Sequence, residues 1–131
     1  MIVIDTDVLV DILAGREPWA GWFRRELPSR RLATTAINRF ELLAGARNEE
    51  EASRFHSFLQ PLAVLSFDRE AADRAGKEGL KLREQGQPLP TADLAIAGIC
   101  LDFEASLLTR NRHHFARIEG LRLETVESPS R

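Results

Sequence analysis

The chain has 131 residues, 44% of them hydrophobic, and a formal net charge of −2. This length is enough for one domain with its own core, and we expect a single domain over residues 1–131. No apolar run approaches the roughly 20 residues of a membrane span, and Met1 leads directly into a short apolar run without a basic leader. These features argue against a membrane protein and predict a cytoplasmic one.

The cysteine and histidine content limits the metal chemistry. Cys100 is the only cysteine, so it can form neither an internal disulfide nor a zinc cluster. His56, His113 and His114 lack the spacing of a helical zinc motif. We therefore expect oxygen ligands at any metal site in this chain.

The first residues predict a buried strand that ends in an acid. Residues 2–4 are apolar and β-branched, as in a strand buried on both faces. Asp5 follows at the carboxyl end, where open α/β sheets bind ligands. Thr6 or Asp7 can cap the next helix, whose apolar residues repeat at helical spacing. A buried carboxylate needs compensation, which a metal or phosphate chemistry would supply; the alternative is that Asp5 only caps a turn.

The middle of the chain alternates between helices and strands. We predict a helix over 19–27, a strand over 30–34, a helix over 36–46, a helix from 49 to before Pro61, and a core strand over 62–67. At least one of the two tryptophans in the first of these helices is expected at a subunit interface. In helix 36–46 the expected apolar face is Ile37, Phe40 and Ala44, and Glu41 shares that face.

The second half continues the alternation. Asp68 caps a polar helix through about residue 84, and residues 85–90 form a loop. Thr91 caps a helix over 92–104 that is apolar nearly all round and therefore buried. Asp93 lies in its first turn, where the helix dipole alone would explain an acid. A core strand over 106–109, a basic segment, an edge-like strand over 120–126 and a frayed tail over 127–131 complete the chain.

This order predicts right-handed βαβ units and a parallel sheet covered on both faces. Strand ends and the helix starts that follow them converge on one edge, so Asp5, Glu41, Asp93 and Asn111 could share a pocket. Clustered carboxylates repel one another unless a cation joins them. Oxygen ligands favour Mg²⁺ or Mn²⁺, which activates water and neutralises charge on a phosphodiester.

Four segments resemble the PIN-domain ribonucleases, and more narrowly the VapC toxins of bacterial toxin–antitoxin pairs. They are Asp5-Thr6 after the apolar start, residues 41–45 (ELLAG), residues 91–97 (TADLAIA) and residues 109–115 (TRNRHHF). The resemblance covers the chain from Met1 to about Val126. It implies a three-layer α/β/α PIN fold with a mainly parallel sheet, and a Mg²⁺- or Mn²⁺-dependent endoribonuclease that cuts structured RNA, either transfer RNA or ribosomal RNA.

The resemblance also implies roles for individual residues. Asp5 and Asp93 match acids that bind the metal directly, and Glu41 matches one that binds through water or positions the attacking water. Thr6 would hold Asp5 or a water. Asn111 stands where many PIN domains carry a fourth acid, which favours one tightly bound ion over two.

The remaining charged residues have weaker expectations. Arg110, Arg112 and Arg117 are expected to contact RNA phosphates, or else to form a solvated basic loop. Asp7 and Asp11 are expected to be solvated or at the edge of the site.

Family resemblance implies partners as well. VapC-like toxins form homodimers and are held inactive by a VapB-like antitoxin, in a hetero-oligomer that binds promoter DNA only through the antitoxin. The helices around residues 19–27 and 37–46 are the candidates for the antitoxin groove.

Two other functions remain open from the sequence. Asp5-Thr6-Asp7 also resembles the nucleophile loop of haloacid-dehalogenase-like phosphatases, although Lys77 and Lys81 have no obvious route to the pocket. Alternatively, the chain is a PIN-like module that binds RNA or a partner without catalysis, for which Asn111 is the supporting feature.

Overall fold

The computed structural model describes residues 1–127. Its sheet has four parallel strands in the order β3-β2-β1-β4, namely β1 (Ile2–Ile4), β2 (Leu32–Thr35), β3 (Ala63–Leu65) and β4 (Ser106–Leu108). Val3 of β1 lies opposite Ala33 on one side and Leu107 on the other. Because all strands run the same way, their carboxyl ends meet at one edge. The predicted α/β fold with a parallel sheet is confirmed.

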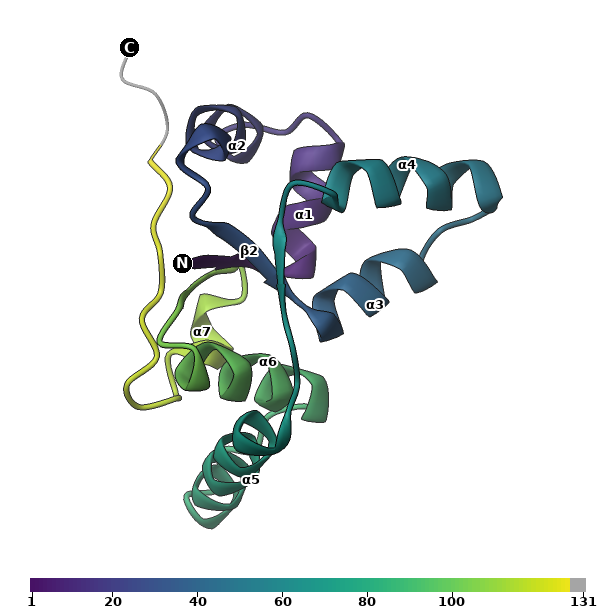
Figure 1. The fold of residues 1–131 in the computed structure, drawn as a ribbon. Helices are drawn as coiled ribbons and strands as arrows, with labels where there is room; N and C mark the ends of the chain where they lie inside the picture. Colours follow the sequence, from purple (N-terminus) through teal and green to yellow (C-terminus); the bar gives the residue numbers. More distant parts are fainter. Residues whose placement is uncertain (128–131) are drawn as a thin grey trace.

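Helices cover both faces of this sheet (Figure 1). One face carries α1 (Thr6–Leu13), α2 (Trp19–Glu26), the 3-10 turn η1 (Leu27–Ser29) and α4 (Glu49–Leu59), and the other carries α5 (Arg69–Glu84), α6 (Thr91–Asp102) and α7 (Arg112–Phe115). Helix α3 (Ala36–Ala44) lies at the carboxyl edge and contacts both α1 and α6. Ile37 packs with the α6 side, and Leu42 with the α1 side.

Strand β1 explains the two cores. Ile2 and Ile4 pack into the cluster beneath α1, whereas Val3 packs into the cluster beneath α6. Successive strand residues point to opposite faces, so a strand with helices on both sides must be apolar throughout. All three residues are at most 5% exposed, which confirms the expectation of a fully buried first strand.

The structure corrects three expected elements. Strand β3 is an edge strand, with Val64 43% exposed, and not a core strand. The predicted last strand is reduced to one bridge between Leu107 and Leu123. Helix α6 starts at Thr91, and its N-cap is Pro90, so Thr91 is not the cap. In the first two cases the strand pattern predicted the right location but overestimated how many residues are paired.

Trp19 and Trp22 are half-buried against the core beneath α1. Among residues 1–127, no helix is both long and apolar enough to cross a bilayer. Most of the predicted C-terminal tail, residues 128–131, lies outside the described residues.

Candidate active site

The Asp5 carboxylate is the centre of a polar network at the carboxyl edge of the sheet. It is only 8% exposed. Its Oδ1 accepts hydrogen bonds from the Thr6 amide and from Asn38 Nδ2, both at 2.8 Å, and its Oδ2 accepts one from Thr109 Oγ1 at 2.7 Å. These donors offset the loss of hydration. Asp5 is also the N-cap of α1, so the expectation that Thr6 or Asp7 caps this helix was wrong.

Asn38 is a member of this network that the sequence did not suggest. It is fully buried, and its Nδ2 also donates to Thr6 Oγ1 at 2.9 Å. Its Oδ1 accepts from Thr35 Oγ1 at 2.7 Å, which fixes Nδ2 as the end that faces Asp5. The inward pair on α3 is Asn38 and Leu42, whereas Phe40 is 69% exposed. The expected apolar face through Phe40 and Ala44 was therefore wrong.

One signal could have identified Asn38. Thr35 is the N-cap of α3, and its hydroxyl accepts from the Asn38 backbone N–H at 3.1 Å. A polar residue three positions after a threonine cap is held near the first turn of its helix. The sequence allows Thr34 or Thr35 as this cap, and a cap at Thr35 places Asn38 in the first turn of the helix, at the carboxyl edge of the sheet.

Glu41 joins the site through Thr6. The Thr6 hydroxyl donates to Glu41 Oε1 at 2.8 Å. Because this hydroxyl accepts from Asn38, its single proton is directed to Glu41. Among residues 1–127, nothing donates a hydrogen bond to Glu41 Oε2, and Glu41 lines an open groove. The predicted juxtaposition of Asp5 and Glu41 is thus present, with Thr6 between them.

Asp93 approaches from the first turn of α6. Burial is the main cause that raises its pKa, and the charge of Asp5 raises the pKa further. His114 opposes both effects, with Nδ1 3.6 Å from Asp93 Oδ2. The side-chain nitrogen Nδ2 of Asn111 lies 2.8 Å from the same His114 nitrogen. The backbone N–H of Asn111 donates to Thr109 Oγ1 at 3.0 Å. No spacing in the sequence predicts a histidine beside Asp93.

A divalent cation fits this edge in charge and in donor type. Asp5 and Asp93 are close enough to repel, and within residues 1–127 no arginine or lysine forms a salt bridge with Asp5, Glu41 or Asp93. In the same range, however, no group of three or more acids, histidines or cysteines is arranged to hold a metal ion. Mg²⁺ and Mn²⁺ sites commonly use one or two carboxylates and fill the other positions with water. The charge and the donor types of this edge therefore suit an ion with few protein ligands, although residues 1–127 form no ready-made metal cluster.

The basic residues near this edge are largely engaged in other contacts. The Arg110 guanidinium lies 5.6 Å from the Trp19 ring centroid and 3.1 Å from Asp11 Oδ2. Arg16 contacts the other oxygen of Asp11 at 2.8 Å. Asp11 is 1% exposed, so of the two alternatives expected for it, a solvated residue or one at the edge of the site, the first was wrong. Arg112 donates to the Glu124 carbonyl at 2.6 Å.

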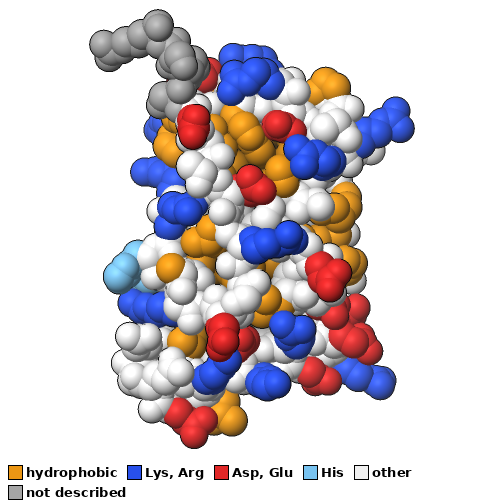
Figure 2. All heavy atoms as spheres, turned by 90° about the vertical axis from the view of Figure 1, so that its left-hand side faces the viewer, with side chains coloured by type: hydrophobic (Ala, Val, Ile, Leu, Met, Phe, Trp, Pro, Cys, Tyr) orange, Lys and Arg blue, Asp and Glu red, His pale blue; other side chains and the backbone are white. Residues whose placement is uncertain are grey.

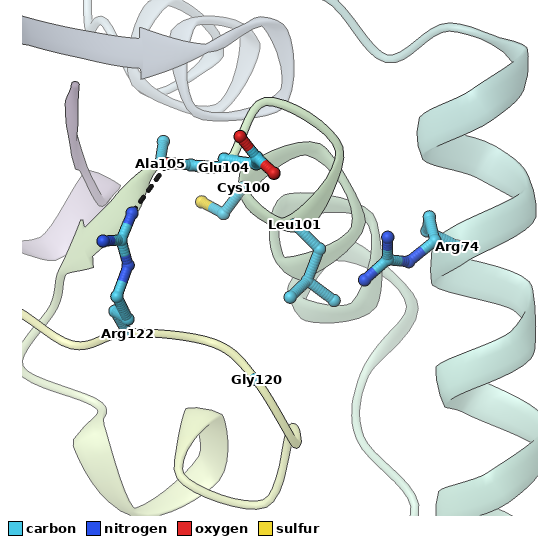
Figure 3. A pocket seen from close by; sticks show the side chains of 7 residues that line it. All are labelled: Arg74, Cys100, Leu101, Glu104, Ala105, Gly120 and Arg122. Atoms are coloured by element: carbon cyan, nitrogen blue, oxygen red, sulfur yellow. Dashed lines mark hydrogen bonds between the residues drawn. The ribbon is translucent and has the colours of Figure 1, made fainter.

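A second cavity, of about 530 Å³, lies at the opposite end of the sheet (Figure 3). Residues before the start of β4 line it together with Cys100, Arg74 of α5 and Arg122, whose guanidinium donates to the Glu104 carbonyl at 2.8 Å. Burial is the first cause that raises the pKa of the Cys100 thiol to about 12, so the thiol stays protonated and is a poor nucleophile. This cavity shares no residue with the acidic edge.

Comparison with known proteins agrees with this geometry. A family model described as the PIN domain matches residues 2–121. Ribonuclease VapC19 from Mycobacterium tuberculosis is 32% identical over 123 residues, which cover 92% of this chain and 97% of that protein. This chain belongs to the PIN-domain family, in its VapC branch. The tRNA(fMet)-specific endonuclease VapC of Shigella flexneri is 26% identical and covers 93% of this chain and 95% of its own length.

Solved structures extend the likeness to the whole fold. VapBC2 from Rickettsia felis, bound to a DNA fragment from its promoter, has a TM-score of 0.85 at 25% identity and covers 95% of this chain and 98% of its own. DNA-bound VapBC from Salmonella typhimurium has a TM-score of 0.81 at 27% identity and covers 94% of this chain and 96% of its own. Because the chain belongs to this family, the phosphatase hypothesis is rejected. The lysine that such a phosphatase needs at its site is also not supplied by Lys81, which is paired with Glu78 at 3.4 Å and with Glu119 at 3.3 Å.

Asp7 provides a test of the electrostatics of this edge. Burial, followed by the charge of Asp5, raises the pKa of Asp7 from 3.8 to about 6. Its Oδ2 accepts from the Arg110 amide at 3.1 Å, and its Oδ1 is buried without a partner within residues 1–127. Of the two alternatives expected for Asp7, a solvated residue or one at the edge of the site, the half-buried position beside Asp5 agrees with the second.

The folded protein should keep a proton on Asp7 that the unfolded chain has lost, between pH about 4 and about 6. The free energy of unfolding therefore falls as pH rises through this window, and Asp7→Asn should remove that part of the fall. Urea unfolding in EDTA across this range measures it, with the exposed Asp73→Asn as the matched control. Parallel pH profiles for wild type and Asp7→Asn would contradict this assignment.

Proposed function

We propose that this protein is a divalent-metal-dependent endoribonuclease, the toxin of a VapBC-type pair, acting in the cytoplasm on structured RNA. The observation that carries the proposal is the meeting of Asp5 and Asp93 from two elements, close enough for one charge to raise the pKa of the other. Two neighbouring acids that no arginine or lysine of residues 1–127 pairs with are costly at the end of a parallel sheet unless a cation binds there. VapC relatives named as ribonucleases support the same reaction class.

Each residue of the acidic edge has a proposed role in RNA hydrolysis. Asp5 and Asp93 would hold Mg²⁺ or Mn²⁺, which when bound lowers the pKa of water and neutralises charge on the phosphodiester. Glu41 lines the groove, and its Oε2 accepts no hydrogen bond within residues 1–127, so it can accept a proton from the attacking water. Thr6 fixes the orientation of Glu41 by donating to Oε1. Asn111 orients His114, the neighbour of Asp93, through the hydrogen bond between its side-chain amide and the imidazole.

RNA would approach over the surface around α7 and the C-terminal segment. The face that carries this segment shows basic side chains spread among apolar and acidic ones, without one continuous basic stripe (Figure 2). Arg110, Arg112 and Arg117 are the proposed phosphate contacts. Arg110 is half-exposed despite its contact with Asp11. Among the described residues, Arg117 makes one long hydrogen bond, to the Pro88 carbonyl at 3.5 Å. Transfer RNA is the first substrate to test, because two relatives are named as tRNA(fMet)-specific endonucleases; ribosomal RNA is the second.

The antitoxin would bind the groove between α1, α3 and α4. This groove has a volume of about 650 Å³. Apolar residues of all three helices line it, together with Thr6, Glu41 and four further charged residues: Arg16, Arg47, Glu51 and Arg54. A segment that fills it would cover Glu41 and so block the site. Of the two helices expected at the groove, α3 lines it and α2 does not.

Assembly beyond one chain is part of the same proposal. Exposed Phe40, on α3, and Val64, on the edge strand β3, offer apolar surface on neighbouring elements for a homodimer. By analogy with the DNA-bound VapBC complexes, promoter DNA would be contacted through the antitoxin in the hetero-oligomer.

The nuclease proposal predicts discrete, metal-dependent fragments from total bacterial RNA. Asp93→Asn should lower the cleavage rate by more than about 100-fold, because a lost metal ligand removes several kcal/mol of transition-state stabilisation. Asp73→Asn, on the exposed side of α5, should cleave like wild type. Sequencing of the fragment ends then identifies the RNA. Cleavage that survives both EDTA and Asp93→Asn would contradict the proposed site, and no cleavage with any metal, in a folded protein that retains RNA binding, would favour the non-catalytic module.

The groove proposal predicts a selective loss of antitoxin binding. Val10 is 45% exposed and lines the groove, so Val10→Glu should place a charge against the apolar face of the antitoxin and abolish co-purification with it. Leu80→Glu, at a 52% exposed position of α5 on the opposite face, is the matched control. Retained binding by Val10→Glu would place the antitoxin elsewhere.

A further inference from the structure

A cavity of about 540 Å³ lies beside the acidic edge, on the side of the sheet that carries α1 and α2. It is formed where β4 ends and is lined by Leu108, Thr109, Arg110 and Arg112, by Trp19 of α2 and by residues 124–126. Thr109 connects this cavity to the site, because its hydroxyl donates to Asp5 Oδ2 at 2.7 Å. Its volume is that of a small-ligand pocket. A ligand in the cavity would therefore lie next to a hydrogen-bond partner of Asp5.

The guanidinium of Arg110 is fixed in the wall of this cavity. The Arg110 backbone N–H donates to Asp7 Oδ2 at 3.1 Å, and Nη1 lies 3.1 Å from Asp11 Oδ2. The guanidinium carbon lies 5.6 Å from the centroid of the half-buried Trp19 ring. The Arg110 side chain is still 53% exposed, and its Nε and Nη2 make no hydrogen bond within residues 1–127. A planar cation and an indole ring are thus held side by side with surface left uncovered.

The charge of the cavity favours an anionic ligand. Arg112 is the first residue of α7, and its Nη1 donates to the Glu124 carbonyl at 2.6 Å, which holds a second guanidinium at the cavity. Among the described residues, Glu124 is the one acid in the lining. Its carboxylate accepts from Ser106 Oγ at 3.0 Å, at the opposite end of β4. Two arginines therefore line the cavity against one acid that is directed elsewhere.

We propose that this cavity binds one unpaired nucleotide of the RNA substrate, with the base stacked on Arg110 and Trp19 and the phosphate held by Arg112. The inference rests on the proposed ribonuclease function and adds a nucleotide subsite to it. Proteins stack unpaired bases on aromatic rings and on guanidinium planes, and arginine suits bidentate phosphate contacts. The free Nε and Nη2 of Arg110 can still contact the next phosphate. The proposed antitoxin groove shares no lining residue with this cavity, which favours RNA over a peptide segment here.

Nuclear magnetic resonance titration of the ¹⁵N-labelled full chain in EDTA tests the subsite, with adenosine 5′-monophosphate (AMP) and ribose 5-phosphate as probes. AMP should shift the indole N–H signal of Trp19 and leave that of Trp22, which does not line the cavity, unchanged. AMP should bind about 10-fold more tightly than ribose 5-phosphate, because only AMP can stack a base. The same spectra show whether each variant is folded.

Two arginine-to-lysine variants separate stacking from charge. Arg110→Lys keeps a cation beside Asp11 but removes the planar group, so AMP and ribose 5-phosphate should then bind with equal affinity. Arg83→Lys, at an exposed position of α5, is the matched control and should keep the advantage of AMP. Arg110→Lys should also lower the affinity for bacterial transfer RNA in EDTA by about 5-fold or more. An unchanged RNA affinity in this variant would assign the cavity to a free nucleotide and overturn the RNA subsite.

The other outcomes are distinguishable from a failure of the proposed nuclease. Equal affinities of the wild type for AMP and ribose 5-phosphate, or a Trp19 signal that AMP leaves unmoved, would overturn the subsite without affecting metal-dependent cleavage. Loss of antitoxin co-purification in Arg110→Lys, with the advantage of AMP retained, would assign the cavity to the antitoxin and overturn the proposal. A wild type that binds AMP and RNA as predicted but cuts no RNA with any metal would support the subsite and contradict the nuclease.

Discussion

The buried carboxylate of Asp5 is the constraint on which the rest of this site depends. Its partners come from the carboxyl ends of the strands or from the helices that follow them: Thr6 after β1, Asn38 after β2 and Thr109 after β4. Each donor is neutral, so the network offsets the lost hydration of Asp5 without cancelling its charge. The three strands cannot shift in register without breaking these bonds, which couples the assembly of the sheet to the geometry of the site.

A second buried acid on the same segment shows what a purely structural solution looks like. Asp11 is even less exposed than Asp5, and two arginines, Arg16 and Arg110, neutralise it. Asp5 has no such partner within residues 1–127, and its charge instead raises the pKa of Asp93. The contrast separates an acid whose charge is neutralised within the fold from one whose charge stays available to a ligand. It also explains why Arg110, although near the site, is anchored by Trp19 and Asp11.

The sequence predicted the parts of the fold and site that depend on strong local patterns. Residues 2–4, the apolar helix around Asp93 and the strand at 106–108 follow from continuous apolar runs, and their order predicts the parallel sheet. Asn38 and His114 were not predicted as site residues. A cap at Thr35 places Asn38 in the first turn of α3, but the contacts of the two side chains with Asp5 and Asp93 are tertiary and follow from no spacing rule. The helical period of α3 was also misread, since nothing local distinguishes a buried asparagine from an exposed phenylalanine when the helix lies at the sheet edge.

The central claim is that Asp5 and Asp93 act as one cation site, and carboxyl ¹³C NMR of the aspartate-labelled protein tests it most directly. The resonances are assigned from Asp5→Asn, Asp93→Asn and Asp73→Asn. The account predicts that titration with Mg²⁺, which is diamagnetic, shifts the Asp5 and Asp93 resonances together along one saturating curve, while the exposed Asp73 stays unchanged. If Mg²⁺ saturates the protein and leaves Asp5 unmoved, or shifts the two acids with different affinities, the account is contradicted.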